Sequence, residues 1–289
     1  MKLYRFCLLV LPLLVLLLLA PSAYADSLGA VLSTFAVLGA KSVTNASSGG
    51  SAATIINGNL GVSPGSSITG FPPGIVNGTI QPGTEATAQG QLTSAYNSLA
   101  GQAVTKSISA GGLNGATLTP GVYDVTSTTF DLTGKLTLDA TGNPNGSWVF
   151  IMSSSLITGS DAAVDLSGFG AGNSVDWIVP SSATLGDSTD FAGNILAGDQ
   201  IAFDPGAQDL CGRALAQTAL VSFAGADPTT GVPNEVGGGC LSSGGLNGGS
   251  VPAAAPEPGT LLLLGSGIIG LAAWMRRPRT RARSAKILC

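Results

Sequence analysis

Short runs that alternate apolar and small polar residues fill the middle of the chain, and most of them end at Gly or Asn. Alternation with a period of two, bounded by turn residues, is typical of short β-strands. We therefore predict a mainly β protein, whose strands include residues 117–119, 136–138, 148–152 and 177–179.

One segment has a different period. Residues 84–102 place apolar side chains three or four positions apart, at Ala88, Leu92, Ala95, Tyr96 and Leu99. This spacing puts a single apolar stripe along an α-helix. The sequence thus predicts one long helix, about residues 84–102, packed alongside the strands.

The strand-like runs recur at regular intervals. Residues 150–164 align without a gap on residues 177–191, and looser matches begin at residues 195 and 214. A step of about 19 residues is typical of one coil of a β-solenoid. The first step is longer, at 27 residues, and residues 167–174 can supply the extra loop. An irregular β-solenoid is therefore predicted for residues 26–224.

Alternation also assigns side chains to faces. The inward positions of successive coils are predicted to be Leu138, Leu156, Ala183, Ile201 and Val221. The outer column beside them is Thr137, Ile157, Thr184, Ala202 and Ser222, flanked by Lys135, Ser155, Ser182, Gln200 and Leu220. The outer column is a ladder of small, mostly uncharged side chains.

Composition argues against most catalytic chemistry. The 289 residues include 42 Gly but no His, and only 10% are charged. Without His, the usual catalytic triads and zinc sites cannot form, and we expect no catalytic residue, metal or cofactor. Glycan cleavage or calcium binding by Asp187, Asp190, Asp199 and Asp204 is the alternative, but aromatic platforms and a calcium-loop spacing are missing.

The N-terminus has the features of an export signal. Lys2 and Arg5 precede an apolar run at residues 6–20, and Ala23-Tyr24-Ala25 supplies small residues for cleavage. We predict a signal peptide at residues 1–25 and a secreted protein. The alternative is an uncleaved membrane anchor.

The C-terminus combines three features in a fixed order. Pro256, Glu257 and Pro258 precede an apolar segment at residues 260–275, and an arginine cluster follows. The apolar segment is shorter than the roughly 20 residues that span a bilayer, and the basic residues are expected to stay cytoplasmic. Residues 256–289 resemble the PEP-CTERM sorting signal of Gram-negative bacteria. This resemblance implies an exosortase partner, transient anchoring in the inner membrane through a short transmembrane helix, and release to the cell envelope or extracellular matrix. A permanent anchor is the alternative.

Charge and cysteine content describe the body between these ends. Residues 26–255 contain 4 basic and 15 acidic residues, a formal net charge of −11. This acidity argues against nucleic acid and anionic membrane surfaces as partners. Export favours a disulfide between Cys211 and Cys240, with two free thiols as the alternative. Residues 225–255 are rich in Gly, Ser and Pro and predict a flexible linker.

Several sequence blocks occur in an order that resembles the microbial ice-binding proteins over about residues 28–224. They include FAVLGAKSVTN (35–45), INGNLGVSPGSSITGFPPGIVNGTI (56–80), LTPGVYDV (118–125) and SSATLGDSTDFAGNILA (181–197). The resemblance implies an irregular β-solenoid with a flanking helix that adsorbs to an ice surface, acts as an antifreeze or inhibits ice recrystallisation, and is not an enzyme. The candidate ice-binding residues are Thr137, Ser155, Ile157, Ser182, Thr184, Ala202 and Ser222.

A second function fits the same features. An exported scaffold of the extracellular matrix could bind exopolysaccharide through the same flat face and have no effect on ice. The carboxylates of Asp161, Asp187, Asp190 and Asp199 bear on this choice, because a carboxylate holds its own hydration water. If they lie on the flat face, we expect weak ice binding or none.

Overall fold

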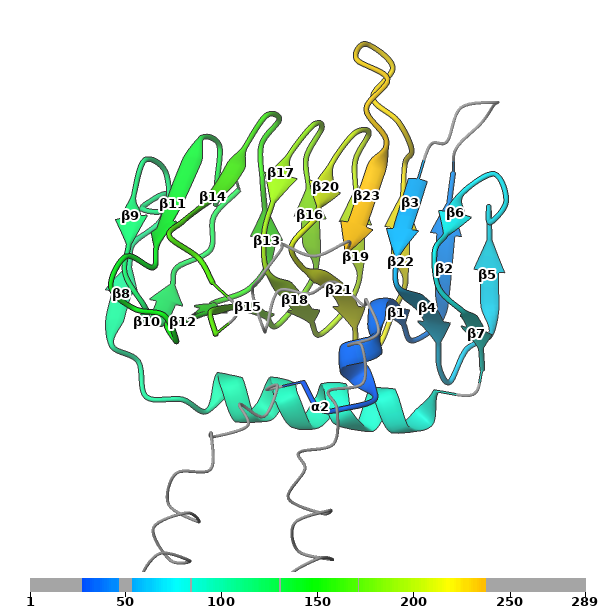
Figure 1. Cartoon of the computed structure of the whole chain (residues 1–289), viewed down its shortest axis with the longest axis horizontal. Helices are drawn as coiled ribbons and strands as arrows, with labels where there is room; N and C mark the ends of the chain where they lie inside the picture. The colour runs from blue at the N-terminus through cyan, green and yellow to red at the C-terminus, as the bar shows by residue number, and fades with distance from the viewer. Residues whose placement is uncertain (1–27, 47–53, 84, 130, 171, 238–289) are drawn as a thin grey trace, which may run out of the picture. The chain divides into compact units, whose positions relative to one another are not determined.

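Parallel β-strands make up most of the structure, and one α-helix lies alongside them (Figure 1). The computed structural model describes residues 28–46, 54–83, 85–129, 131–170 and 172–237. The strands form three parallel sheets, here called A, B and C, and each complete coil of the chain runs from sheet A to sheet B to sheet C. This confirms the mainly β prediction and is consistent with a β-solenoid.

Each sheet stacks one short strand per coil. In spatial order, sheet A contains β7 (Ile80–Pro82), β4 (Asn59–Val62), β1 (Phe35–Gly39), β21 (Arg213–Ala216), β18 (Asn194–Ala197), β15 (Ser174–Val179), β12 (Ser147–Met152), β10 (Gly121–Val125) and β8 (Lys106–Ile108). Sheet B contains β13 (Leu156–Ile157), β16 (Ala183–Leu185), β19 (Ile201–Phe203), β22 (Val221–Phe223), β2 (Ser42–Asn45) and β5 (Ser67–Thr69). Sheet C contains β6 (Ile75–Val76), β3 (Thr54–Asn57), β23 (Asn234–Gly237), β20 (Gln208–Asp209), β17 (Asp190–Phe191), β14 (Ala163–Ser167), β11 (Lys135–Asp139) and β9 (Thr117–Leu118).

The strand registers confirm the predicted repeat. Phe150 pairs with Trp177, Trp177 with Ile195, and Ile195 with Ala214. The longest step carries its extra residues between Ser167 and Ser174, where β14 ends and β15 begins. The alternation of apolar and polar residues therefore aligned these coils correctly.

The coils are not stacked in the order of the sequence. β1 pairs with β21 on one side and with β4 on the other, so the coils that precede the helix stack onto the coil formed by β21, β22 and β23. The helix α2 (Ala86–Ala100) then carries the chain from β7, at one end of sheet A, to β8, at the other end (Figure 1).

Helix α2 has 15 residues and is shorter than the long helix predicted over residues 84–102. Its predicted stripe faces the sheet: Ala88, Leu92, Ala95 and Leu99 are buried, and Tyr96 is half-buried beside them. They share a cluster with outward side chains of sheet A, among them Leu38, Val149, Ile178, Leu196 and Leu215. The short 3-10 helix η1 (Leu32–Thr34) packs against α2, because the Gln91 side-chain oxygen accepts the N–H of Leu32 at 2.8 Å. One face of sheet A is therefore covered by helices.

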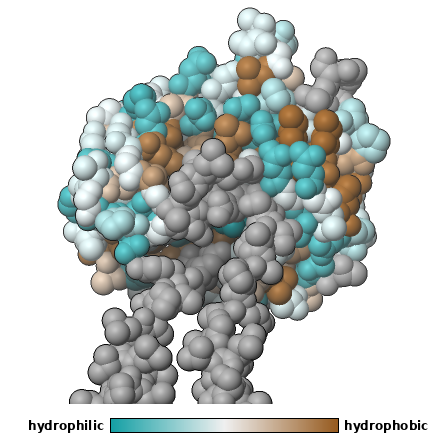
Figure 2. Space-filling model, in the orientation of Figure 1, coloured by the Kyte–Doolittle hydropathy of each residue, from teal (hydrophilic) through white to brown (hydrophobic). Residues whose placement is uncertain are grey.

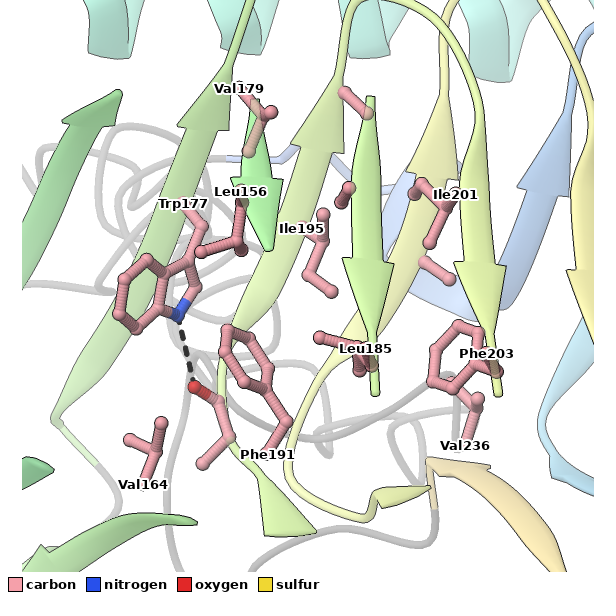
Figure 3. Close-up of a cluster of buried hydrophobic side chains, with 14 of the residues drawn as sticks. Leu156, Val164, Trp177, Val179, Leu185, Phe191, Ile195, Ile201, Phe203 and Val236 are labelled. Carbon is pink, nitrogen blue, oxygen red and sulfur yellow. Dashed lines mark hydrogen bonds between the residues drawn. The ribbon is translucent and has the colours of Figure 1, made fainter. Parts of the chain in front are cut away.

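Apolar side chains fill the space enclosed by the three sheets (Figure 3). Aromatic rings stack from coil to coil within it, and the centroids of Phe150 and Trp177 lie 4.0 Å apart with an angle of 14° between the planes. The Trp177 indole also donates a hydrogen bond to the Ala192 carbonyl at 3.0 Å. Such stacking adds about 0.5–1.5 kcal/mol per pair beyond burial alone. The packing holds successive coils in one register.

The predicted linker begins too early. β23 (Asn234–Gly237) lies within residues 225–255 and pairs with both β20 and β3. The buried Asn234 amide donates to the carbonyls of Asp204 at 2.7 Å and Ala207 at 3.0 Å. The domain therefore extends at least to Gly237, because strand pairing, the Asn234 hydrogen bonds and the buried Val236 hold this short strand in the sheet.

Several predictions concern residues outside the described ranges. They are the signal peptide at 1–25, Cys240, the linker beyond Gly237 and the sorting signal at 256–289. Within the described ranges, no helix has the length and apolar content needed to cross a membrane.

Candidate functional site

The outer faces of the three sheets differ in what covers them. Helices cover sheet A. Sheet C carries charged side chains that are not buried, namely Lys135, Asp165, Asp190 and Glu235. Figure 2 shows hydrophilic and hydrophobic residues mixed on the side where the strands of sheet C lie in front. Sheet B differs from both. Within the described chain, no helix covers its outer face, and the residues along the middle of that face carry no charge.

The central outer column of sheet B runs across all six strands. In order along the sheet, the residues in register are Ile157, Thr184, Ala202, Ser222, Thr44 and Thr69. The first five are half-buried and Thr69 is exposed. Parallel strands lie about 4.7–4.9 Å apart, so the column presents methyl and hydroxyl groups at a regular spacing. We call these six residues the sheet B column.

Buried side chains hold the column in place from below. Leu156, Ala183, Ile201, Val221 and Val43 alternate with the column and are each 0% exposed. The rings of Phe203 and Phe223 pack with their centroids 4.9 Å apart under the neighbouring coils. A face supported by close packing on its inner side is rigid, because core side chains occupy single rotamers.

The structure brings together most of the predicted site. Ile157, Thr184, Ala202 and Ser222 stand in register as expected. Ser155 and Ser182 lie one residue before β13 and β16, and the Leu156 N–H donates to the Ser182 carbonyl at 3.0 Å. They therefore flank the column at its β13 end.

Thr137 does not belong to this face. It lies in β11 of sheet C, in register with Thr117 and Asp165, next to the ion pair of Lys135 with Asp165. The predicted register is wrong here, and also for Leu138, which pairs with Leu166 rather than with a strand of sheet B. The alternation around residue 137 matches that of sheet B, but a single coil contains more than one alternating strand.

Sequence reasoning missed Thr44 and Thr69, which complete the column, and Ser42 and Ser67, which pair beside them. The segments SVTN (42–45) and SIT (67–69) have the same apolar and hydroxyl alternation as the later strands. They were overlooked because they precede the helix and fall outside the run of regular repeats.

The carboxylates lie around the sheet B column rather than in it. Asp161 and Asp187 follow β13 and β16 in turns, and Asp199 precedes β19. Asp190 lies on sheet C, where partial loss of hydration and then the charge of Asp165 raise its pKa. Asp204 follows β19, and burial and then the charge of Asp187 raise its pKa. Within the described ranges, His, Cys, Asp and Glu form no group of three placed to hold a metal.

The turn after sheet B is closed by buried threonine hydroxyls. Gly186 donates its N–H to the Thr158 hydroxyl at 2.9 Å, and the hydroxyls of Thr158 and Thr189 lie 2.8 Å apart. A Cβ at position 186 would come within 2.6 Å of the Thr158 carbonyl oxygen, so the turn requires Gly. The turn places Asp187 at the margin of the face.

The β13 end of sheet B is closed by a carboxylate. Asp131 accepts the N–H of Ile157 at 3.0 Å and the N–H of Thr128 at 2.7 Å. Burial raises the pKa of Asp131, and these hydrogen bonds oppose the rise. Because the carboxylate and the backbone of residues 131–132 satisfy the edge strand, this end is not open to strand addition.

Cys211 is disulfide-bonded. Its predicted partner, Cys240, lies outside the described residues, so the pairing of these two cysteines stays a prediction.

Two family models match the chain. The model described as ice-binding-like matches residues 37–227, and the PEP-CTERM protein-sorting motif matches residues 254–277. A protein of Nostoc sp. (strain HG1) named as an ice-binding protein is 41% identical over 255 residues, which are 87% of each chain.

Solved structures agree with this match. A crystal structure of an ice-binding protein from an Antarctic biological consortium has a TM-score of 0.62 and 36% identity, and covers 75% of this chain and 92% of its own. An ice-binding protein from the Antarctic ascomycete Antarctomyces psychrotrophicus has a TM-score of 0.61 and 32% identity, and covers 72% of this chain and 96% of its own.

Proposed function

The chain belongs to the ice-binding-like family, and we propose that it is an exported protein that adsorbs to ice through the sheet B column. The observation that carries the proposal is the register of six uncharged side chains on one sheet, which no helix covers in the part of the chain that the structure describes. We take the stacked coils to be a β-solenoid, whose strand spacing sets the spacing of the column.

The physical basis is the match between the column and solid water. Strands about 4.8 Å apart repeat at nearly the interval of oxygen atoms in ice. Methyl groups of Thr184 and Ala202 leave water in their neighbourhood free to order, and hydroxyls such as Ser222 can join the ordered layer by hydrogen bonds. A charged group would instead hold water in its own hydration shell, because removing the hydration of a charge costs a large free energy.

Adsorption explains the activity without turnover. Ice that grows between bound molecules develops a curved front, and a curved front is less stable than a flat one at the same temperature. Growth therefore stops within a temperature interval, and large crystals no longer grow at the expense of small ones. No general base, nucleophile or cofactor takes part in these steps.

The ends of the chain support a route to the cell exterior. We propose that residues 1–25 direct export and are removed, and that the motif matched at residues 254–277 is recognised by an exosortase. The apolar segment at 260–275 would then anchor the chain transiently in the inner membrane of a Gram-negative cell.

Ice adsorption tests the proposed function directly. A chain ending at Ser250, labelled with a fluorophore, is frozen slowly onto a cold finger, and its concentration is compared between ice and liquid. We expect enrichment in the ice, while an unrelated acidic protein stays in the liquid. Equal exclusion of both proteins from the ice would refute the proposal.

A further inference from the structure

Sheet B has a second outer row of residues beside the sheet B column. Pairing continues one residue past β19, because the Asp204 N–H donates to the Leu185 carbonyl at 2.9 Å. The next coil continues in the same way, since the Ala224 N–H donates to the Phe203 carbonyl at 2.9 Å. Leu185 and Phe203 lie inside the core (Figure 3), so the residues that follow them lie on the outer side of the sheet. We call this second row the marginal row, and its residues are Gly186, Asp204, Ala224 and Ala46.

Asp204 is the one member of the marginal row whose side chain is larger than a methyl group. Gly186 has no side chain, and the exposed Ala224 and Ala46 each present a methyl group. Asp204 follows Ala202 of the sheet B column by two residues, which in a strand places the two rows about 6.6 Å apart. Without the carboxylate, the marginal row would therefore continue the small, uncharged surface of the column.

The half-buried Asp204 carboxylate has acidic neighbours, and no cation of the described ranges forms an ion pair with it. On the β16 side it faces Asp187, and partial loss of hydration and then the charge of Asp187 raise the pKa of Asp204. On the β22 side, the marginal row continues with the uncharged Ala224. The acid that follows in that turn, Asp227, accepts the Ser188 hydroxyl at 2.6 Å. Asp204 therefore becomes neutral at a higher pH than an ordinary Asp.

We propose that Asp204 sets the width of the ice-binding face: its charge keeps ice off the marginal row, and a neutral residue there lets the row join the sheet B column. This role rests on the proposed function and adds a residue that limits it. A carboxylate holds its own hydration water, so an ice-like layer that forms over the column ends at Asp204. Loss of the charge removes that barrier and leaves the shape of the face unchanged.

Replacement of the carboxylate by an amide of the same size tests this role. Thermal hysteresis of the wild type and of Asp204→Asn is measured at about pH 8 and about pH 4, and circular dichroism confirms that both are folded. At the higher pH we expect Asp204→Asn to be about twofold more active, because adsorption strengthens with the area in contact. At the lower pH the wild type should approach Asp204→Asn, because its own carboxyl is then largely neutral.

Two further variants separate the position of the charge from its amount. Asp124→Asn, at an exposed position of β10, removes the same charge away from sheet B and should keep wild-type activity at both pH values. Asp204→Asn combined with Ala224→Asp returns a carboxylate to the marginal row, one coil further along. This double variant should have the lower activity of the wild type at the higher pH and should gain activity at the lower pH.

Failure of this role and failure of the proposed function give different results. If the wild type binds ice and Asp204→Asn has the same activity at both pH values, Asp204 does not limit the face and the proposed function stands. The same conclusion follows if Asp124→Asn gains as much activity as Asp204→Asn, or if the double variant keeps the gain. If neither the wild type nor any variant affects ice at either pH, the proposed function itself is wrong.

Discussion

Thr44 on β2 lies directly beside Ser222 on β22, although the two residues come from opposite ends of the domain. The contact joins the coils before the helix to the last coil of the later repeat. The sheet B column is therefore one continuous surface built from two separate parts of the chain.

Replacement of Thr44 tests this continuity. Thr44→Tyr places a large ring on the column and should prevent close approach to ice on both sides of the junction. We expect thermal hysteresis to fall by about half or more, since a central clash in a contact surface costs more than one at its rim. Thr117→Tyr, on exposed sheet C, is the matched control. Full activity of the Thr44 variant would show that the face ends at β22.

A single charge on the column should weaken ice binding more than a change of shape. Ala202→Asp adds a carboxylate at the centre of the column, whereas Ala202→Asn adds an uncharged group of the same size. At neutral pH we expect much lower recrystallisation inhibition with Asp than with Asn. Below about pH 4 the carboxyl becomes neutral, and the two variants should become alike. Equal activity at both pH values would argue against a role for hydration.

Two cations differ in their expected contribution to stability. Arg213 is buried at the corner between sheets C and A, with hydrogen bonds to Asn194 and Ser33, whereas the Lys135 side chain is 61% exposed in its pair with Asp165. Removal of the Arg213 guanidinium leaves the buried Asn194 and Ser33 oxygens without these hydrogen bonds, which costs about 1–3 kcal/mol for each group, and an exposed pair contributes about 0–1 kcal/mol. Urea unfolding of Arg213→Met and Lys135→Met should reproduce this difference. Similar losses for the two variants would contradict it.

Asp209 should make stability depend on pH. Its carboxyl is 0% exposed, and burial raises its pKa well above 3.8, although Gly193 and Arg213 act in the opposite direction. The folded state therefore holds a proton that the unfolded state releases, so the contribution of Asp209 is present below about pH 4 and is lost as the pH rises through the folded pKa.

The Asp209→Asn variant removes this dependence, because Asn cannot ionise. Relative to the wild type, its melting temperature should rise between pH 4 and pH 8, and circular dichroism can follow both. Asp124→Asn, at an exposed position of β10, controls for the loss of one carboxylate at the surface. A difference between wild type and Asp209→Asn that does not change with pH would contradict this role.

Local alternation was sufficient to predict the strands and the steps between coils. Phe150, Trp177 and Ile195 lie in register because each fills the core at the same place in its coil, and burial requires a large apolar residue there every time. Ile157, Thr184, Ala202 and Ser222 followed from these alignments. The sequence therefore predicts the short strands of a coil correctly when the core residues next to them repeat from coil to coil.

Alternation could not show which coils are neighbours in space. Thr44 and Thr69 join the column because β1 pairs with β21 across the whole domain, and no local pattern records that pairing. Thr137 was misplaced for the related reason that strands of sheets B and C alternate in the same way. The strand at Asn234 was missed because hydrogen bonds of its side chain, rather than a run of apolar residues, hold it.

The central claim is that the sheet B column, and neither of the other faces, binds ice. Thermal hysteresis of Thr184→Tyr and Thr137→Tyr, measured side by side with the wild type at equal concentration, tests it most directly. We predict that Thr184→Tyr loses most of its activity and that Thr137→Tyr keeps it, with both variants folded by circular dichroism. Full activity of Thr184→Tyr together with loss of activity in Thr137→Tyr would contradict the account and move the ice-binding face to sheet C.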